Sequence, residues 1–342
     1  MKRSLICLIL VLLMAISMVG CSNTNTSSEP ASNSTEPSEK SSDFPSRPIT
    51  WIVPWKPGGA NDICARLIAP ELEKILGVPV KITNTEGAGG WIGYDMLLSS
   101  DADGYTICSV SLPGMIANYL NPDANRKNTY KDFAPLVNFA RDYIVVCIRP
   151  DEDRFSTFKE IYEYSKTHEL TVAGTSGAGD DGIAIAQFNL LEGAKFVQLA
   201  TTGSSESLTN LLGKHADICV MNVSEVGNPI KAGQIKVVAA AAPERVKQLP
   251  EVPTILEETG VSIIADSSRG IITKAGVPED ALKILTDAII EALQTPSLKE
   301  QLAAQGIEVE ILQGEDYEKY MQEVEEMMAE LGPKYFGWKI NK

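Results

Sequence analysis

The fold is decided by one stretch, Ile52-Val53-Pro54-Trp55-Lys56-Pro57-Gly58-Gly59-Ala60-Asn61-Asp62-Ile63-Cys64-Ala65-Arg66. The apolar run 49–53 predicts a buried strand, and the Pro and Gly residues that follow end it. We expect Asn61 or Asp62 to cap the helix that comes next. The order of strand, glycine loop and helix start is typical of an anion site.

A helix leaves its first backbone N–H groups unpaired and carries partial positive charge at that end, so a small anion can dock there. Gly58 and Gly59 leave the approach open. A second glycine-rich turn, 86–93, follows an expected strand at 80–82 and precedes an expected helix at 94–98. Either turn alone is more often a tight connection, so the prediction of an anion site depends on their succession.

Neither loop matches a nucleotide-binding motif. No Gly-Lys-Ser/Thr follows the first loop, which excludes a Walker A motif, and 87–93 only approaches the dinucleotide pattern G-x-G-x-x-G. The sequence therefore favours a carboxylate over a nucleotide.

Residues 1–20 are predicted to be a lipoprotein signal peptide. Lys2 and Arg3 precede the apolar run 5–19, which is short for a membrane span. The ending Val-Gly-Cys at 19–21 resembles a bacterial lipobox, so we expect cleavage and lipidation of Cys21. An uncleaved anchor is the alternative.

Residues 21–43 are predicted to be a disordered tether. They are mostly Ser, Thr, Asn, Glu, Pro and Lys, which cannot bury enough apolar surface to offset the entropy of ordering. We therefore expect an extracytoplasmic protein that is lipid-anchored to the cell membrane.

Charge and residue usage exclude several classes of function. The formal net charge of −15 becomes −17 without Lys2 and Arg3, and nucleic-acid binding needs a basic face. With two His and no CxxC pair, we expect no metal site and no cofactor. The cysteines beyond Cys21 are predicted to be buried thiols, and two disulfides stay open as alternatives, Cys64 with Cys108 or Cys147 with Cys219.

About 300 residues follow Phe44, more than one core usually holds, so we expect two lobes. Expected strands are 106–110, 143–148, 171–173, 196–199, 218–221, 237–241 and 263–272. Expected helices are 158–167, 182–192, 206–213, 281–294, 296–305 and 316–331. This alternation predicts an α/β fold with parallel sheets and ligands at the carboxyl ends of the strands. Strands 143–148 and 263–272 are the candidates to cross between lobes, with the ligand in the cleft.

Eight segments resemble the substrate-binding receptors of tripartite tricarboxylate transporters, the Bug-type receptors. They are 44–49, 57–66, 87–90, 103–106, 132–135, 211–213, 230–233 and 249–254. The resemblance covers essentially all of 44–342 in the same order. It implies a two-lobed periplasmic binding protein fold of type II, each lobe an α/β sandwich with a mostly parallel sheet, joined by two crossing strands. Lobe 1 would comprise 44–144 plus 266–342, and lobe 2 would comprise 145–265.

The resemblance also implies that backbone amides and waters hold a ligand carboxylate. In the first lobe the binding residues would be Gly58, Gly59, Ala60, Asn61, Asp62, Gly89, Gly90, Trp91, Ile92 and Ser111. In the second lobe they would be Ser176, Gly179, Asp180, Asp181, Thr201, Gly203, Ser204 and Asn222. From its position on the second crossing strand, Arg269 either clamps a carboxylate or pairs with Asp62 or Asp266 as scaffold.

The chain departs from the family pattern in the second lobe. Small hydroxyl residues and a His are common where this chain has Asp180-Asp181-Gly182, and a common Tyr-Lys pair is here Thr201-Thr202. The two carboxylates either cap a helix or face the cleft. In the cleft they would repel a second ligand carboxylate and favour an ammonium, so an amino acid is plausible beside a dicarboxylate.

We expect a monomeric solute-binding protein, not an enzyme, whose partners are the membrane subunits of a tripartite tricarboxylate-type transporter. Neither His168 nor His215 has the setting of a catalytic base, and 174–178 does not match G-x-S-x-G. Two alternatives remain open. A sensor that presents ligand to a membrane kinase needs the same cleft, and a secreted hydrolase is the third class.

Overall fold

The computed structural model describes residues 44–339 except Ser176. The predicted signal peptide, Cys21 and the tether lie outside the described residues, as does Ser176 from the predicted site. The described residues belong to one compact unit.

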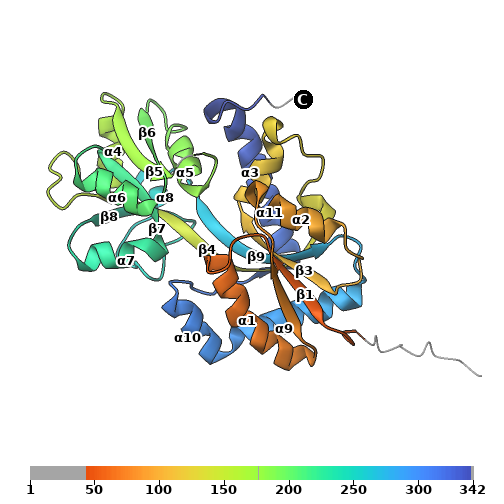
Figure 1. The fold of residues 1–342 in the computed structure, drawn as a ribbon. Helices are drawn as coiled ribbons and strands as arrows, with labels where there is room; N and C mark the ends of the chain where they lie inside the picture. Colours follow the sequence, from red (N-terminus) through yellow and green to blue (C-terminus); the bar gives the residue numbers. More distant parts are fainter. Residues whose placement is uncertain (1–43, 176, 340–342) are drawn as a thin grey trace, which may run out of the picture. The chain divides into compact units, whose positions relative to one another are not determined.

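The strands form one connected sheet (Figure 1). They are β1 (Ile49–Val53), β2 (Val80–Asn84), β3 (Thr106–Leu112), β4 (Phe133–Ile148), β5 (Leu170–Thr175), β6 (Phe196–Thr201), β7 (Ile218–Asn222), β8 (Lys236–Ala241), β9 (Asp266–Lys274) and β10 (Leu312–Gln313). Their order is β2-β1-β3-β9-β4-β7-β5-β6, and β8 and β10 also pair with β4. The long strand β4 therefore holds the two lobes together.

Parallel and antiparallel pairing divide between the lobes and the strands that join them. In the first lobe β1 pairs in parallel with β2 and β3, and in the second lobe β5 pairs in parallel with β6 and β7. The strands β4 and β9 pair antiparallel with each other and with their other neighbours. The predicted two-lobed α/β fold with two crossing strands is thus confirmed.

The partners of β4 change in the middle of the strand. Residues 133–143 pair with β9, whereas residues 144–148 pair with β7 and β8. This change lies beside the expected boundary between residues 144 and 145. The exact lobe boundaries remain a prediction.

Helices cover the sheet on both faces. They are α1 (Ala60–Leu76), α2 (Trp91–Leu98), α3 (Gly114–Leu120), α4 (Phe158–Ser165), α5 (Asp180–Phe188), α6 (Ser204–Leu212), α7 (Val223–Lys231), α8 (Ile255–Thr259), α9 (Glu279–Gln294), α10 (Pro296–Ala304) and α11 (Gly314–Tyr335). In the first lobe, α1, α9 and α10 bury one core with one face of the sheet, and α2, α3 and α11 bury another core on the opposite face.

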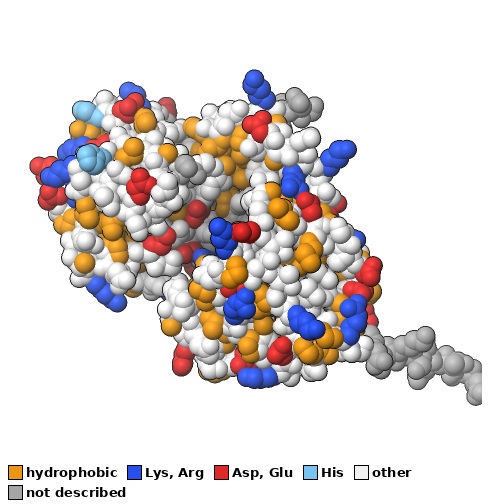
Figure 2. Space-filling view, in the orientation of Figure 1, with side chains coloured by type: hydrophobic (Ala, Val, Ile, Leu, Met, Phe, Trp, Pro, Cys, Tyr) orange, Lys and Arg blue, Asp and Glu red, His pale blue; other side chains and the backbone are white. Residues whose placement is uncertain are grey.

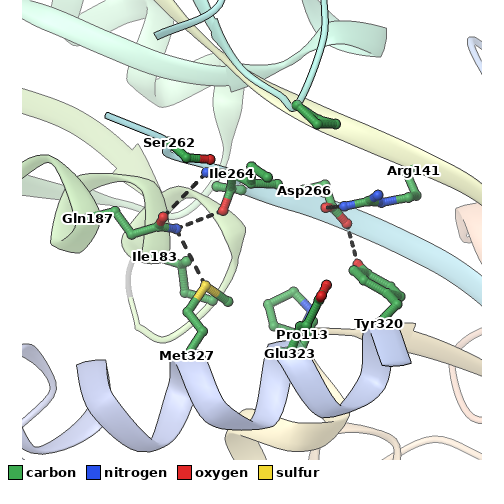
Figure 3. A pocket seen from close by; sticks show the side chains of 13 residues that line it. Pro113, Arg141, Ile183, Gln187, Ser262, Ile264, Asp266, Tyr320, Glu323 and Met327 are labelled. Carbon is green, nitrogen blue, oxygen red and sulfur yellow. Dashed lines mark hydrogen bonds and ion pairs between the residues drawn. The ribbon is translucent and has the colours of Figure 1, made fainter. Parts of the chain in front are cut away.

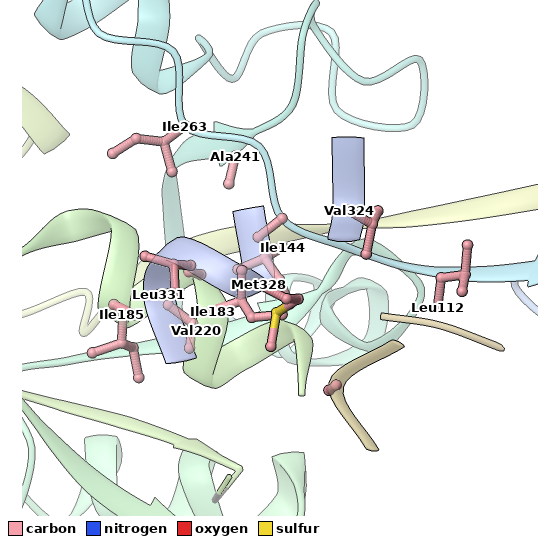
Figure 4. Packing of buried hydrophobic residues seen from close by; sticks show 14 of the residues in the cluster. Leu112, Ile144, Ile183, Ile185, Val220, Ala241, Ile263, Val324, Met328 and Leu331 are labelled. Carbon is pink, nitrogen blue, oxygen red and sulfur yellow. The ribbon is translucent and has the colours of Figure 1, made fainter. Parts of the chain in front are cut away.

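Helix α11 packs in both lobes. Its apolar stripe, which includes Val324, Met328 and Leu331, recurs at helical spacing and is buried. The stripe shares a hydrophobic cluster with Leu112 of the first lobe and Ile183 of the second (Figure 4). The helix contacts both α3 and α5, so the C-terminal part of the chain bridges the lobes.

Several helices begin a few residues before the positions expected from the sequence, and part of one strand was missed. Gly59, not Asn61 or Asp62, is the N-cap of α1, because Asp62 lies inside the first turn and turns its carboxylate back to the loop. Residues 133–142 were not expected as strand, since Pro135 interrupts the pattern. The structure places Pro135 beside a shift in pairing register, where a proline is tolerated.

Candidate functional site

Most predicted site residues lie at the loops and helix starts that follow the parallel strands of each lobe, whereas Ser111 and Arg269 lie on β3 and β9. In the first lobe, the loop after β1 leads into α1 and the turn after β2 leads into α2. We call residues 58–62 and 87–92 the glycine edge. In the second lobe, α5, α6 and α7 begin directly after β5, β6 and β7. Figure 2 shows the surface hollowed between the two lobes, with acidic and basic side chains along the hollow.

The two turns of the glycine edge lie side by side. The Asn84 Nδ2 group at the end of β2 donates to the backbone oxygen of Trp55 at 3.1 Å and to Asp62 Oδ1 at 2.8 Å. Gly93 of α2 has no space for a side chain, because a Cβ there would lie 2.7 Å from Pro54 Cβ. The helix therefore packs directly against the first loop, and the two turns predicted to act together are neighbours.

Asp62 is committed to partners within its own lobe. Its Oδ2 accepts from the Gly58 N–H at 2.8 Å and from Arg66 Nε at 2.9 Å. Burial would raise the pKa of Asp62, but hydrogen bonds from Arg66, Gly58 and Asn84 bring it below its ordinary value. The Asp62 carboxylate is thus ionised and buried, and its charge is balanced by Arg66. It fixes the conformation of the loop.

The second turn winds through left-handed backbone. Gly89 and Gly90 have φ of +63° and +94°, a region that glycine adopts without strain. Trp91 is fully buried below the turn, with its indole N–H donating to the Met115 oxygen and its backbone N–H to Ala88. A ligand would therefore meet neither N–H of Trp91. The next residue, Ile92, is half exposed.

Arg269 lies between the two lobes on β9, opposite Ser111 of β3. Its charge lowers the pKa of the buried Cys64 thiol of α1 and of the half-buried Asp142 carboxyl, although desolvation still raises both above their ordinary values. Among the described residues, the Arg269 guanidinium has no hydrogen-bond partner and no ion pair. Ser111 donates its hydroxyl to the Ser268 oxygen at 3.1 Å.

Both scaffold partners considered for Arg269 are occupied by other residues. Asp266 accepts from Arg141 at 2.6 Å and from the Tyr320 hydroxyl, on the α11 side of the sheet. Asp62 is held by Arg66 and Asn84. Because side chains alternate along a strand, Asp266 and Arg269 point to opposite faces. Arg269 is therefore a half-buried cation without a protein counter-ion among the described residues.

The helix starts of the second lobe carry carboxylates. We call Asp180, Asp181, Glu206 and Glu225 the acidic edge. Asp180 accepts from Asn222 Nδ2 at 2.9 Å, and the same amide group donates to the Asp142 backbone oxygen. Asn222 thereby links the start of α5 to the crossing strand β4.

The other acidic-edge carboxylates fasten the loops before their helices. Asp181 is buried and accepts from the backbone N–H and hydroxyl of Thr175 at 2.7 and 2.9 Å. Burial, and then the charge of Asp180, raise the pKa of Asp181 to about 7. Glu206 accepts from Thr202 in the same way, and Glu225 accepts from the N–H of Asn222. Asp180 and Glu225 also bond to side chains outside their own loops and helices, Asp180 to Asn222 and Glu225 to Ser204.

The remaining predicted residues of the second lobe lie around these starts. Thr201 is buried and its hydroxyl shares a hydrogen bond with Ser207 at 2.7 Å. Gly179 and Gly203 are the N-caps of α5 and α6, and a Cβ at either would meet nothing within 4 Å. The Ser204 hydroxyl donates to Glu225. The two glycine caps therefore leave open space in front of the helices.

Sequence reasoning missed Asp142 and Ser224. The Asp142 carboxylate accepts from the N–H and hydroxyl of Ser224 at the start of α7. It lies in the half of β4 that was not expected to be a strand, so no pattern pointed to it.

A cavity of about 570 Å³ also joins the lobes, and it is lined by Gly114 and Asn118 of α3, by the loop 177–179, and by Phe336 and Trp338.

A second cavity lies on the α11 side of the crossing strands (Figure 3). It measures about 360 Å³ and is lined by residues of β9, α5 and α11. Arg141, Asp266 and Tyr320 form one wall, and Gln187 bonds to the Ile264 backbone on the other. Because Asp266 and Arg269 face opposite sides, this cavity is separate from the site around Arg269.

Two general features of the described residues bear on the site. His, Cys, Asp and Glu side chains form no cluster of three or more there that could hold a metal ion. Within 44–339, none of the helices combines the length and apolar character that crossing a bilayer requires.

Comparisons with known proteins agree with this geometry. A family model described as tripartite tricarboxylate transporter family receptor matches residues 64–331. Protein BugT of Bordetella pertussis is 31% identical over 267 residues, which is 77% of this chain and 81% of that protein. A TctC solute-binding protein from Polaromonas superposes with a TM-score of 0.80 at 25% identity, covering 85% of this chain and 99% of that one.

A more distant structure has the same fold with a ligand bound. The R. palustris protein Rpa4515, solved with adipate, has a TM-score of 0.67 at 22% identity and covers 86% of this chain and 99% of its own. The matches to the family model, to BugT and to the Polaromonas protein go beyond a shared fold. This chain belongs to the tripartite tricarboxylate transporter receptor family and is a solute-binding receptor with a two-lobed fold of type II.

Proposed function

We propose that this chain captures a small carboxylate between its lobes and delivers it to the membrane subunits of a tripartite tricarboxylate-type transporter. Family membership supports the delivery role, and the adipate held by Rpa4515 supports the ligand class. The chain binds its ligand and releases it chemically unchanged. The acid lies between the glycine edge and the acidic edge.

The observation that carries this proposal is the state of Arg269. A half-buried guanidinium is desolvated, and it has no counter-ion among the described residues. A ligand carboxylate would supply the missing partner through a bidentate hydrogen bond. The helix starts of the glycine edge add positive partial charge from the same lobe.

Asp180 favours a zwitterionic ligand over a plain dicarboxylate. Asp181 and Glu206 bond to their own loops, and Glu225 bonds to the Asn222 N–H and to Ser204, whereas Asp180 is bound to the side-chain amide of the interlobe residue Asn222. An ammonium group on the ligand would gain from this carboxylate, whereas a second ligand carboxylate would be repelled. An amino acid, with its acid at Arg269 and its amine at Asp180, fits both charges.

The test is a thermal-shift panel on the purified chain with dicarboxylates, tricarboxylates, amino acids and aromatic acids. Ligand at 100 times its dissociation constant stabilises the folded state by about 2.7 kcal/mol, so a true ligand should give a clear shift. We expect at least one strong stabiliser, with unchanged ligand recovered after incubation. No shift across the panel would argue against carboxylate capture, and a changed ligand would argue for catalysis.

Lipid anchoring is a separate part of the proposal. Cys21 should carry lipid after removal of residues 1–20, so the Cys21→Ser chain should leave the membrane fraction or keep its signal peptide. Mass spectrometry of the N-terminal peptide distinguishes these outcomes. An unmodified Cys21 in a membrane-bound wild-type chain would instead support the uncleaved anchor.

A further inference from the structure

Two buried cysteines of the second lobe face each other across neighbouring strands. Cys147 of β4 is directly opposite Cys219 of β7 in an antiparallel pair, and both are fully buried in one hydrophobic cluster. Directly opposite residues in antiparallel strands have Cα atoms about 4.5 or 5.5 Å apart. Disulfides bridge Cα separations of about 4.4 to 6.8 Å, so the backbone can accept a bridge here.

The other cysteine pair is arranged in the opposite way. Cys64 of α1 is buried in the core on one face of the first-lobe sheet, whereas Cys108 of β3 is buried in the core on the other face. The sheet therefore separates the two thiols. Both disulfides were open alternatives in the sequence, and the structure favours one of them on geometry alone.

We propose that Cys147 and Cys219 form an intramolecular disulfide when the chain folds in the presence of a disulfide oxidant. The two thiols lose two protons and two electrons as the S–S bond forms, and the oxidant's disulfide is reduced to two thiols. A thiolate of one cysteine attacks the mixed disulfide on the other, which releases the second oxidant thiol. The structure holds both residues as free thiols and thus represents the reduced form.

The position of the pair determines when the bond can form. The neighbouring Cys219 thiol and then burial raise the pKa of Cys147 well above its ordinary value, so the folded chain offers little reactive thiolate. An oxidant must therefore reach the pair before β7 packs against β4. Once formed, the bond is buried and protected from reductants, so each folded form keeps the redox state in which it folded.

A bridge at this place would fasten two strands of the second lobe three residue pairs away from their cleft end, where Ile144 lies opposite Asn222. It joins the crossing strand β4 to β7, which ends at Asn222, the residue that binds both Asp142 and Asp180. It also closes a long loop between residues 147 and 219, which reduces the entropy of the unfolded chain. The oxidised form should therefore resist denaturants more than the reduced form.

The experiment refolds the purified chain from denaturant with oxidised glutathione, in parallel with a sample refolded under reductant. Free thiols are then blocked in denaturant, and the peptides are mapped by mass spectrometry without reduction. We expect a peptide pair joined through Cys147 and Cys219 in the oxidised sample, and a higher urea midpoint for that sample. The already folded, reduced chain exposed to the same oxidant should give no such pair.

Matched variants separate the bridge from general oxidation. Cys147→Ala and Cys219→Ala should each abolish the joined peptides and the redox dependence of the urea midpoint, whereas a Cys64→Ala, Cys108→Ala double variant should keep both. Two results would overturn the proposal. One is oxidative refolding that leaves Cys147 and Cys219 fully alkylated in folded protein, and the other is a dominant disulfide that includes Cys64 or Cys108.

Discussion

The glycine edge and the acidic edge are built alike but carry different charge. In both lobes, strands end in loops whose residues precede helix starts, and a carboxylate in the first turn holds the loop. At the glycine edge this carboxylate, Asp62, is neutralised by Arg66 and Asn84. At the acidic edge, no Lys or Arg of the described chain forms an ion pair with any of the four carboxylates. This contrast is the basis for proposing a ligand with two chemically different ends.

The largest expected effect tests whether the glycine edge depends on close packing. In Gly93→Ala, the new Cβ would lie 2.7 Å from Pro54 Cβ and 3.2 Å from Ile52 Cγ2. We expect the free energy of unfolding to fall by about 1–3 kcal/mol, measured by urea denaturation. Gly227→Ala in α7 is the control, because a Cβ there meets nothing within 4 Å and alanine favours helix. Equal stability of the two variants would contradict the packing role of Gly93.

The next effect tests the cation between the edges. Arg269→Gln removes the charge that a ligand carboxylate would meet, so affinity for the ligand found in the panel should fall about tenfold or more. Arg269→Lys keeps the charge but loses the bidentate geometry, so its affinity for the ligand should lie between those of the wild type and Arg269→Gln. Titration calorimetry measures both, with the exposed Lys195→Gln as a control for net charge. If Arg269→Gln bound the ligand with unchanged affinity, Arg269 would have a structural role and no role in binding.

A smaller effect is expected in the pH dependence of stability, which differs between the buried carboxyl groups of the two edges. The pKa of Asp181 is raised to about 7, so the folded state binds its proton more tightly than the unfolded state does. This contribution to stability is present near pH 4 and is lost as pH rises to about 7. Asp181→Asn mimics the protonated carboxyl and keeps a hydrogen-bond acceptor for Thr175. Its free energy of unfolding should therefore match that of the wild type near pH 4.5.

The same variant should be more stable than the wild type near pH 8, where Asp181 is charged. Urea midpoints at the two pH values measure this difference. Asp62 has a lowered pKa, so Asp62→Asn should show the opposite trend, with its largest destabilisation at neutral pH. If the stability of both variants changed with pH in the same way, the proposed electrostatic difference between the two edges would be wrong.

The smallest effect concerns ligand choice at the acidic edge. Asp180→Asn should weaken an amino-acid ligand by about threefold to tenfold, the range for a partly exposed charge pair, and spare or improve a dicarboxylate. Glu206→Gln is the matched control, because Glu206 is exposed and bonds to its own loop at Thr202. Equal changes for both ligand classes would assign Asp180 to helix capping alone.

Much of the fold could be predicted from local patterns. Strand β1 was predicted with its observed bounds, because an apolar run ended by Pro and Gly leaves little choice of length. The alternation of strands and amphipathic helices fixed the class of fold. Helix starts were harder, since Gly59 became the cap of α1 only because Asp62 is held by Asn84, which lies on the neighbouring strand.

The site was predictable in its loops but not in its charges. The glycine turns are visible in the sequence as short motifs, and the structure places them side by side. Whether Arg269 is paired depends on Asp62 and Asp266, whose partners come from distant segments. Asp142 was missed because the strand that carries it contains a proline. Charge pairing is a tertiary property that a local pattern does not contain.

Helix α11 has a consequence for how the receptor moves. It contacts α3 in one lobe and α5 in the other, and Gln187 of α5 reaches Met327 on it. Any rotation of one lobe against the other must break or slide one of these two interfaces. The balance between open and closed states is therefore set partly by the last helix of the chain, on the side of the sheet opposite Arg269.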